Sequence, residues 1–371
     1  MTNKNLRIGV VTGSRADFGL LRPVYRALGK QNCTPLLFVT GMHLLPAFGL
    51  SWKTINLPIA ARVPMYPGDP SDTARGARGL AKAFKKEKLD CLIVLGDRKE
   101  MLAGAIAAFD LNIPIAHIHG GDAAQSGHQD EIIRPILSLL SDLHFPASQR
   151  SKERLILLGV DQKTIHLSGS PALDAVRAHT FGSEKKVQEI LGVTNRYAIV
   201  LFHPHDAATN EGDKHIRTIF AALEDNRERE LVIIYPNNDA GHERIIAEIK
   251  KLSRKKGVHI FKNMPQSLFL DALRYAEFLI GNSSGALYEC SYMEVPAINV
   301  GDRNRGREHG KNVVDLEPNA SKIRAAIKKI SSSSFKKNMH VDRNYFGNGK
   351  AAEIIAKSVI DEIRKNSHAH G

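Results

Sequence analysis

Hydrophobic residues recur along the chain in short runs, each followed by a polar turn and then by a longer amphipathic stretch. Short apolar runs that alternate with helical stretches are typical of strand–helix–strand units in a parallel sheet. In the first half, segments such as 18–28 and 100–109 are predicted to be helices. The apolar runs predict strands at residues 7–12, 34–40, 91–95, 115–119, 143–146 and 165–167.

The same rhythm restarts at residues 198–202, so a second sheet is predicted. A chain of 371 residues also fits two domains of ordinary size better than one. The predicted fold class is α/β, with two doubly wound domains at 1–175 and 176–349 facing a central cleft. An amphipathic helix at 350–365 is expected to pack back on the first domain. The further strands of the second domain are predicted at 231–235, 259–261, 278–280 and 297–300.

Composition narrows the class of protein. With 43% hydrophobic and 25% charged residues, the chain is of the globular type. Its longest apolar runs, such as 197–202, are too short for a membrane span, and the N-terminus lacks a signal-peptide pattern. Cys33, Cys91 and Cys290 are too far apart in sequence to suggest a disulfide framework or a metal cluster. We therefore expect a cytoplasmic protein with reduced thiols and no membrane partner.

The net charge of +13 raises the question of nucleic acid as a partner. The Lys/Arg clusters at 82–88, 250–256 and 328–337 fall on the expected solvent faces of helices, without interleaved aromatic residues. The chain also carries no zinc-finger or helix-turn-helix signature. We expect no nucleic-acid partner, and an anionic small molecule bound by a few arginines accounts for part of the charge.

The first predicted turn, TGSRADFG at residues 12–19, directly follows a strand. A glycine turn that opens into a helix presents backbone N–H groups and a positive dipole end to a phosphate. Arg15 adds a bidentate donor for the same anion. The turn lacks the three spaced glycines of a dinucleotide fingerprint and is not a Walker loop, so a turn without a ligand remains an alternative.

Carboxylates gather after the next strands. Asp97 and Arg98 follow one strand, and Asp122 closes a Gly-Gly turn after the next. Asp97 either transfers protons from a cleft or caps the following helix. A metal site at His119, Asp122 and His128 is a further alternative, although the spacing matches no established zinc pattern.

Asp130, Glu131 and Arg134 open the following helix. Glu131 and Arg134 lie three apart on one helical face, so the arginine could orient the carboxylate. Acidic groups gathered at one sheet edge cost stability unless proton transfer or a cation uses them. This cluster predicts acid–base chemistry.

The second half carries a complementary set of polar residues. His203 follows a predicted strand, where a histidine can move protons or bind a phosphate. The hydroxyl and N–H groups of Ser283, Ser284 and Gly285 suit a diphosphate, and Glu289 could reach ribose hydroxyls. Arg303 is another candidate anion ligand. A capped helix with a solvated Glu289 and a solvated arginine loop remain the alternatives.

Taken in order, these segments resemble the hydrolysing UDP-N-acetylglucosamine 2-epimerases, particularly those that feed sialic- or legionaminic-acid synthesis. The resemblance implies a GT-B-like fold of two Rossmann-like domains, and a reaction that needs neither nicotinamide nor a metal. It also implies a homodimer or homotetramer. The matching segments are Thr12–Leu21, Val39–Gly49, Leu95–Met101, Ile115–Asp122, Asp130–Arg134, Phe202–Pro204, Pro236–Gly241, Gly281–Glu289, Gly301–Arg307 and Tyr345–Ala351.

The resemblance also implies a reaction and residue roles. The family removes the C2 proton of a UDP-linked 2-acetamido sugar, expels UDP through a 2-acetamidoglucal, and adds water to give the free 2-epimer. The positions that resemble its catalytic residues are Asp97, Asp122, Asp130, Glu131 and His203. The positions that resemble its substrate-binding residues are Arg15, Arg98, Arg134, Ser283, Ser284, Gly285, Glu289 and Arg303.

Two positions depart from the family pattern. Asp122 stands where relatives usually have Glu, and Pro135 stands where they often carry His. Both are consistent with a different sugar, such as a 4-acetamido-6-deoxy derivative, or with a GDP carrier. A non-hydrolysing 2-epimerase, a GT-B glycosyltransferase and an inactive binding module are the alternatives. The carboxylate cluster argues against the transferase, because sugar transfer requires no C2 deprotonation.

Overall fold

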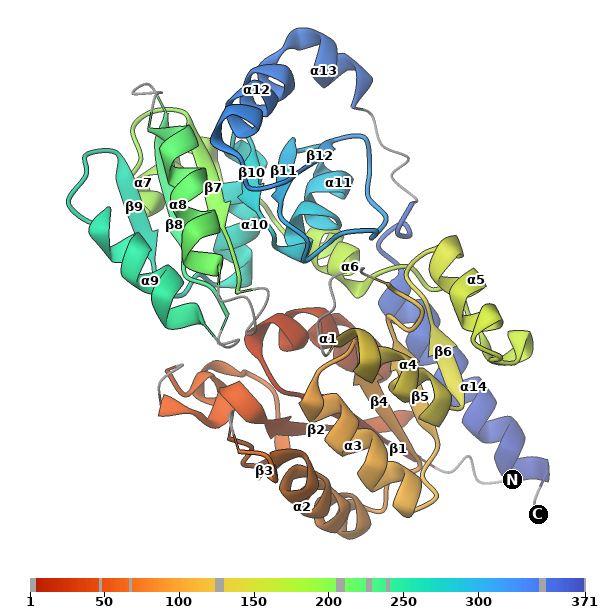
Figure 1. Cartoon of the computed structure of the whole chain (residues 1–371). Coiled ribbons are helices and arrows are strands. Elements are labelled where there is room, and N and C mark those ends of the chain that lie inside the picture. The colour runs from red at the N-terminus through yellow and green to blue at the C-terminus, as the bar shows by residue number, and fades with distance from the viewer. Residues whose placement is uncertain are drawn as a thin grey trace. The chain divides into compact units, whose positions relative to one another are not determined.

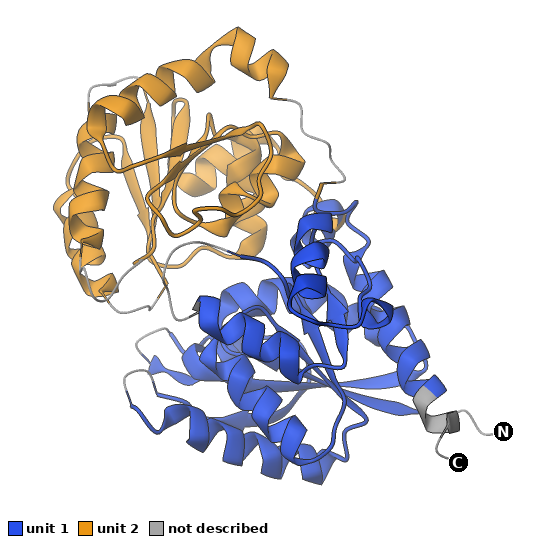
Figure 2. Ribbon diagram, turned by 45° about the vertical axis from the view of Figure 1, so that its right-hand side comes forward, with its two compact units in different colours: residues 1–123, 129–177, 346–371 blue, residues 124–128, 178–345 orange. Residues whose placement is uncertain are grey.

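The computed structural model describes residues 5–46, 49–66, 69–123, 130–204, 211–224, 229–237, 241–339 and 345–369. The chain forms two compact units (Figure 2). Unit 1 comprises residues 1–123, 129–177 and 346–371, and unit 2 comprises residues 124–128 and 178–345.

Unit 1 contains a parallel six-stranded sheet in the order β3-β2-β1-β4-β5-β6, the order of a Rossmann fold. The strand order reverses between β1 and β4, and ligands of such sheets bind beyond the carboxyl ends of the strands at this switch point. The strands are β1 (Leu6–Thr12), β2 (Cys33–Thr40), β3 (Ile59–Val63), β4 (Cys91–Leu95), β5 (Ile115–Ile118) and β6 (Leu143–Phe145).

Helices cover both faces of this sheet, because successive side chains of a buried strand point to opposite faces. Val10 belongs to the core under α1 and α14, whereas Val11 belongs to the core under α2, α3 and α4. The unit's helices are α1 (Arg15–Leu28), α2 (Asp72–Glu87), α3 (Lys99–Asp110), α4 (Asp130–Leu140), α5 (Gln149–Leu157), α6 (Pro171–Ala178) and α14 (Ala351–Ala369).

The last helix, α14, is blue in Figure 1 and belongs to unit 1. Its residues Ile355 and Val359 are fully buried in the same core as α1. The Asp174 carboxylate caps the start of the helix by accepting the N–H groups of Ala351 at 3.0 Å and Ala352 at 2.9 Å. The C-terminal segment is thus part of the core of unit 1.

Unit 2 repeats the topology, with a parallel sheet in the order β12-β11-β10-β7-β8-β9 and the switch point between β7 and β10. Gly281, with φ 148°, ends β10 so close to β7 that a Cβ atom would lie 1.9 Å from the carbonyl oxygen of Leu201. The strands are β7 (Tyr197–Leu201), β8 (Glu230–Ile234), β9 (Val258–Phe261), β10 (Leu279–Gly281), β11 (Ala297–Val300) and β12 (Val313–Leu316).

Two hydrophobic cores cover the two faces of this sheet. One contains residues of α8 (Gly212–Leu223), α9 (His242–Lys251) and α12 (Ala320–Ser331). The other contains residues of α7 (Glu184–Leu191), α10 (Gln266–Tyr275) and α11 (Glu289–Met293). The short helix α13 (Ser333–Asn338) follows α12.

The predicted α/β class with two doubly wound sheets is confirmed, with three differences in detail. The strand predicted at 165–167 is wrong, because Ile165 forms only an isolated bridge with His144. The sequence pattern missed β3 and β12, which are edge strands. Each of them has one buried residue, so neither reads as an apolar run. Among the described residues, no helix has the length and apolar character that crossing a membrane requires.

Candidate active site

Arg134 contacts the carboxylate of Asp97 and the backbone of Asp122 in unit 1. Its Nη2 forms an ion pair with Asp97, and its Nη1 donates a hydrogen bond to the Asp122 carbonyl oxygen at 2.7 Å. Arg134 is 7% exposed, so the guanidinium is held between β4 and the turn after β5. The Arg134 guanidinium is thus paired with Asp97, and the expected orientation of Glu131 by Arg134 stays a prediction. Glu131 itself is half-buried at the start of α4.

The Asp122 side chain is fixed by a hydroxyl group. Its Oδ1 accepts a 2.8 Å hydrogen bond from Ser151 Oγ, and its Oδ2 lies 4.0 Å from His119 Nδ1. A Cβ atom on Gly121 would lie 2.0 Å from the Ser151 carbonyl oxygen, so this approach requires glycine. The turn after β5 therefore packs directly against the first turn of α5.

Part of the predicted cluster lies outside this description. The side chain of Asp130 and the whole of His128 are not among the described residues. Within the described ranges, no three His, Cys, Asp or Glu side chains are grouped so as to hold a metal ion.

A second charged cluster at this edge involves two acidic residues that the sequence analysis did not single out. Arg98 Nε lies 3.9 Å from Asp17 Oδ2 and 3.3 Å from Glu100 Oε2. Burial raises the pKa of Asp17 to about 6, opposed by the charge of Arg98 and assisted by that of Glu100. Arg98, predicted to bind substrate, is thus flanked by two buried carboxylates.

Two polar groups of the predicted phosphate-binding turn make hydrogen bonds within the protein. Gly13 N–H donates to Asp17 Oδ2 at 3.3 Å, and Ser14 caps α1 by accepting the Asp17 N–H at 3.2 Å. The three-residue spacing of Ser14 and Asp17 resembles a capping box and was the available signal for Asp17. Arg15 is half-buried at the first position of α1, and burial lowers its pKa.

Unit 2 brings its predicted residues together at the carboxyl ends of β7 and β10, which pair in the sheet. His203 follows β7, and Asn282 follows β10. The Asn282 side chain accepts the His203 N–H at 2.7 Å and donates to the His203 carbonyl oxygen at 2.9 Å. Asn237, after β8, donates its backbone N–H to His203 Nδ1 at 3.0 Å.

The serine turn continues directly from Asn282. Ser283 Oγ accepts the Gly285 N–H at 3.3 Å, which fixes a short 3₁₀ turn at Ser284–Ala286. Glu289 begins α11 beside this turn, and burial raises its pKa. The Glu289 carboxylate lies against the turn, because a Cβ atom placed on Gly285 would lie 3.7 Å from Glu289 Oε2.

The arginine loop packs against the same turn. Arg303 Nη1 donates to the Asn282 carbonyl oxygen at 3.2 Å, and the side chain of Asn304 donates to it at 2.9 Å. Arg307 donates to Tyr288 Oη at 3.0 Å. The loop considered as a solvated charge run is therefore anchored at the strand ends through Arg303 and the buried Asn304.

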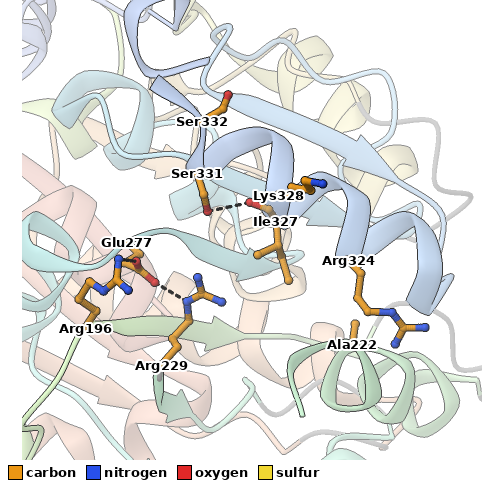
Figure 3. Close-up of a pocket in the computed structure, with 9 residues that line it drawn as sticks. All are labelled: Arg196, Ala222, Arg229, Glu277, Arg324, Ile327, Lys328, Ser331 and Ser332. Atoms are coloured by element: carbon orange, nitrogen blue, oxygen red, sulfur yellow. Dashed lines mark hydrogen bonds and ion pairs between the residues drawn. The ribbon is translucent and has the colours of Figure 1, made fainter. Parts of the chain in front are cut away.

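A pocket of about 510 Å³ lies in unit 2, at the opposite ends of the same strands (Figure 3). Glu277 forms ion pairs there with Arg229 and, at 3.3 Å, with Arg196. Arg324 donates to the Ala221 carbonyl oxygen near the end of α8, and Lys328 lies in the last turn of α12. Cations are favourable at helix C-termini, so their presence here has a structural explanation.

Comparison with known proteins identifies the family. Residues 26–360 match the model of the UDP-N-acetylglucosamine 2-epimerases. The chain belongs to this family. Two curated members are similar to it over most of their length. It is 31% identical over 360 residues to a hydrolysing UDP-N,N'-diacetylbacillosamine 2-epimerase of Legionella pneumophila, covering 94% of this chain and 93% of the relative. It is 32% identical over 334 residues to a UDP-N-acetylglucosamine 2-epimerase of Neisseria meningitidis, covering 88% of each chain.

A solved structure supports the fold of this family member. The UDP-N-acetylglucosamine 2-epimerase of Neisseria meningitidis bound to UDP-N-acetylglucosamine is 20% identical, with a TM-score of 0.84. The match covers 96% of this chain and 100% of that chain. The predicted GT-B-like fold class is thereby confirmed.

Proposed function

We propose that this epimerase-family member is a hydrolysing 2-epimerase of a UDP-linked 2-acetamido sugar. It releases UDP and the free 2-epimeric sugar. The observation that carries the proposal is a pair of positioned carboxylates at the carboxyl edge of the first sheet: Asp97, paired with Arg134, and Asp122, hydrogen-bonded by Ser151. Proton abstraction from carbon needs positioned carboxylates of this kind. The hydrolysing relative of Legionella pneumophila supports the choice of reaction.

The proposed first step is an elimination. A carboxylate of the set Asp97, Asp122, Asp130 and Glu131 takes the proton from C2 of the sugar. The C2–H electron pair forms a C1=C2 double bond while the C1–O bond breaks and UDP departs, leaving a 2-acetamidoglucal. Water then adds to the double bond: its oxygen bonds to C1 and its released proton passes to a carboxylate of this set, while a protonated carboxyl group of the set returns a proton to C2 on the opposite face. Atoms and charge balance, and the sugar leaves as the 2-epimer.

The departing diphosphate carries the developing negative charge, so its stabilisation is the second requirement. We assign this role to the polar edge of unit 2: His203, the N–H and hydroxyl groups of Ser283, Ser284 and Gly285, and Arg303. Glu289 accepts ribose hydroxyl groups. Arg15 and Arg98 add positive charge from unit 1. Unit 1 is thus assigned the proton transfer and unit 2 most of the diphosphate binding.

Proton NMR in deuterated water tests the proposal. The full chain is incubated separately with UDP-N-acetylglucosamine and with UDP- and GDP-linked 2,4-diacetamido-6-deoxy sugars. We expect released UDP and a free 2-epimeric sugar that carries deuterium at C2. Retention of the sugar on UDP as a mixture of C2 epimers would identify the non-hydrolysing reaction. Turnover that occurs only with an added acceptor, without deuterium at C2, would identify a glycosyltransferase.

A further inference from the structure

His203 is held by its neighbours on both sides in the sheet. Asn282, 1% exposed, uses both ends of its amide on the two peptide groups of His203, at 2.7 Å and 2.9 Å. The Asn282 oxygen faces a peptide N–H and its nitrogen faces a peptide carbonyl, so these partners fix the orientation of the amide. These two hydrogen bonds, called here the Asn282 clamp, fix the backbone of His203 and so the position of its imidazole ring.

The imidazole ring of His203 is held by a hydrogen bond from the backbone of Asn237. The backbone N–H of Asn237 points at His203 Nδ1 with an N···N distance of 3.0 Å. A peptide nitrogen can only donate, so Nδ1 must accept and carries no proton. A neutral imidazole with an unprotonated Nδ1 carries its proton on Nε2. Protonation of Nδ1 would set two N–H groups against each other and lose this hydrogen bond.

The backbone of Asn282 is held in turn by the side chain of Asn304, which also bonds Asn299. The Asn304 side chain donates both to the Asn282 carbonyl oxygen, at 2.9 Å, and to Asn299 Oδ1, at 3.1 Å. Asn299 in turn donates to Asp315 Oδ1 at 2.8 Å. Asn299 and Asn304 are each 1% exposed, so the hydrogen bonds from Asn299 to Asn282 are buried and have a defined direction, while the Asp315 end on β12 is exposed.

We propose that Asn282 is a positioning residue that presents His203 as a neutral imidazole with its proton on Nε2. His203 then donates a hydrogen bond to an anionic oxygen of the leaving diphosphate and is not the base that removes the C2 proton. The identity of that anion rests on the proposed function, whereas the tautomer does not. A neutral imidazole that acts as a hydrogen-bond donor is an established arrangement in enzymes.

The tautomer is tested in the full chain without substrate. Long-range ¹H–¹⁵N spectra of ¹⁵N-histidine-labelled protein are recorded at about pH 7.5, above the ordinary histidine pKa. The His203 signals are assigned by their loss in His203→Gln. We expect a protonated Nε2 and an unprotonated Nδ1. An Nδ1-protonated pattern or an imidazolium overturns the proposal, even if the protein proves to be an active epimerase. The expected pattern with an inactive protein leaves the tautomer standing and overturns the proposed function.

The role of Asn282 is tested by Asn282→Asp. The new side chain still accepts the His203 N–H but can no longer donate to the His203 carbonyl oxygen. Asn312→Asp is the matched control. Asn312 directly precedes β12 and is fully buried in the same unit. Its side chain donates a hydrogen bond to the Val295 carbonyl oxygen and accepts one from the Ser291 hydroxyl group.

Loss of a hydrogen bond to a charged group corresponds to about a 10-fold effect or more. We expect Asn282→Asp to weaken UDP binding by about this factor and to disturb the His203 tautomer pattern. We expect Asn312→Asp to lower the thermal midpoint while UDP affinity and the His203 spectrum stay unchanged. If Asn282→Asp behaves like the control, Asn282 is structural and the proposal fails.

Discussion

The two units share one strand order and carry opposite kinds of polar chemistry at the same place in the sheet. At the β1/β4 switch point, unit 1 gathers titratable groups in ion pairs, such as Asp97 with Arg134. At the β7/β10 switch point, unit 2 gathers buried neutral amides and hydroxyls, such as Asn282 and Ser283. Proton transfer needs groups that change charge, whereas holding an anion needs dipoles of fixed direction. The two units therefore share a strand order and differ in the polar side chains at the switch point.

The largest expected effect is on turnover in Asp97→Asn. Removing a proton-transfer group costs about 100- to 10,000-fold in kcat. UDP affinity, assigned to unit 2, is expected to change much less. Steady-state kinetics and UDP titration measure the two quantities. Asp90→Asn is the control, because Asp90 accepts the Arg7 N–H at 2.8 Å at the other end of β4. Full turnover in Asp97→Asn would exclude Asp97 from the proton transfer.

Asp122→Glu tests whether turnover depends on the length of the carboxylate side chain at the same edge of unit 1. The substitution introduces the residue that the family resemblance implies at this position and lengthens the side chain by one methylene, while the 2.8 Å hydrogen bond from Ser151 is made to aspartate. A displacement of about 1 Å at a reacting group can cost on the order of 100-fold, so we expect kcat to fall. A rise in kcat with UDP-N-acetylglucosamine would show instead that Asp122 selects for another sugar.

The stability of unit 1 should depend on pH through Asp17, whose folded pKa is about 6 against an ordinary 3.8. The folded state binds this proton more tightly, so the stability it contributes is present below about pH 4 and lost as the pH rises through 6. Asp17→Asn should remove that loss, on the order of 3 kcal/mol between these limits. Trp52, the single tryptophan, lies in unit 1 and reports its unfolding in urea. An unchanged slope with pH in the variant would contradict the assignment.

The smallest effect is expected in unit 2. Arg303→Ala should weaken UDP binding several-fold, with little change in kcat at saturation, because it removes one charge-assisted hydrogen bond to the anion. Arg324→Ala removes an arginine from the pocket at the other end of the sheet and should leave UDP affinity unchanged. Isothermal titration of UDP compares the two. Equal weakening in both variants would point to a general effect of charge.

The sequence predicted much of this arrangement, because buried parallel strands read as apolar runs and the residues after them line the sheet edge. Asp97, His203 and Ser283 were found in this way. The roles of Asp17, Glu100 and Asn282 were not predicted, although all lie in or beside segments already noted. Their roles depend on which strands are neighbours: β1 with β4 brings Asp17 to Arg98, and β7 with β10 brings Asn282 to His203. The rhythm of hydrophobic residues does not determine the order of strands.

The position of α14 in the core of unit 1 affects the order in which the two units can fold during synthesis. Residues 178–345 form nearly all of unit 2 in one continuous stretch, so this unit can fold while the ribosome is still at work. Unit 1 begins first but lacks Ile355, Val359 and Ile363 until the final helix has emerged. Until then, the apolar surface beneath α14 stays open to water and to chaperones. The part of the protein that is translated first is therefore the last to be completed.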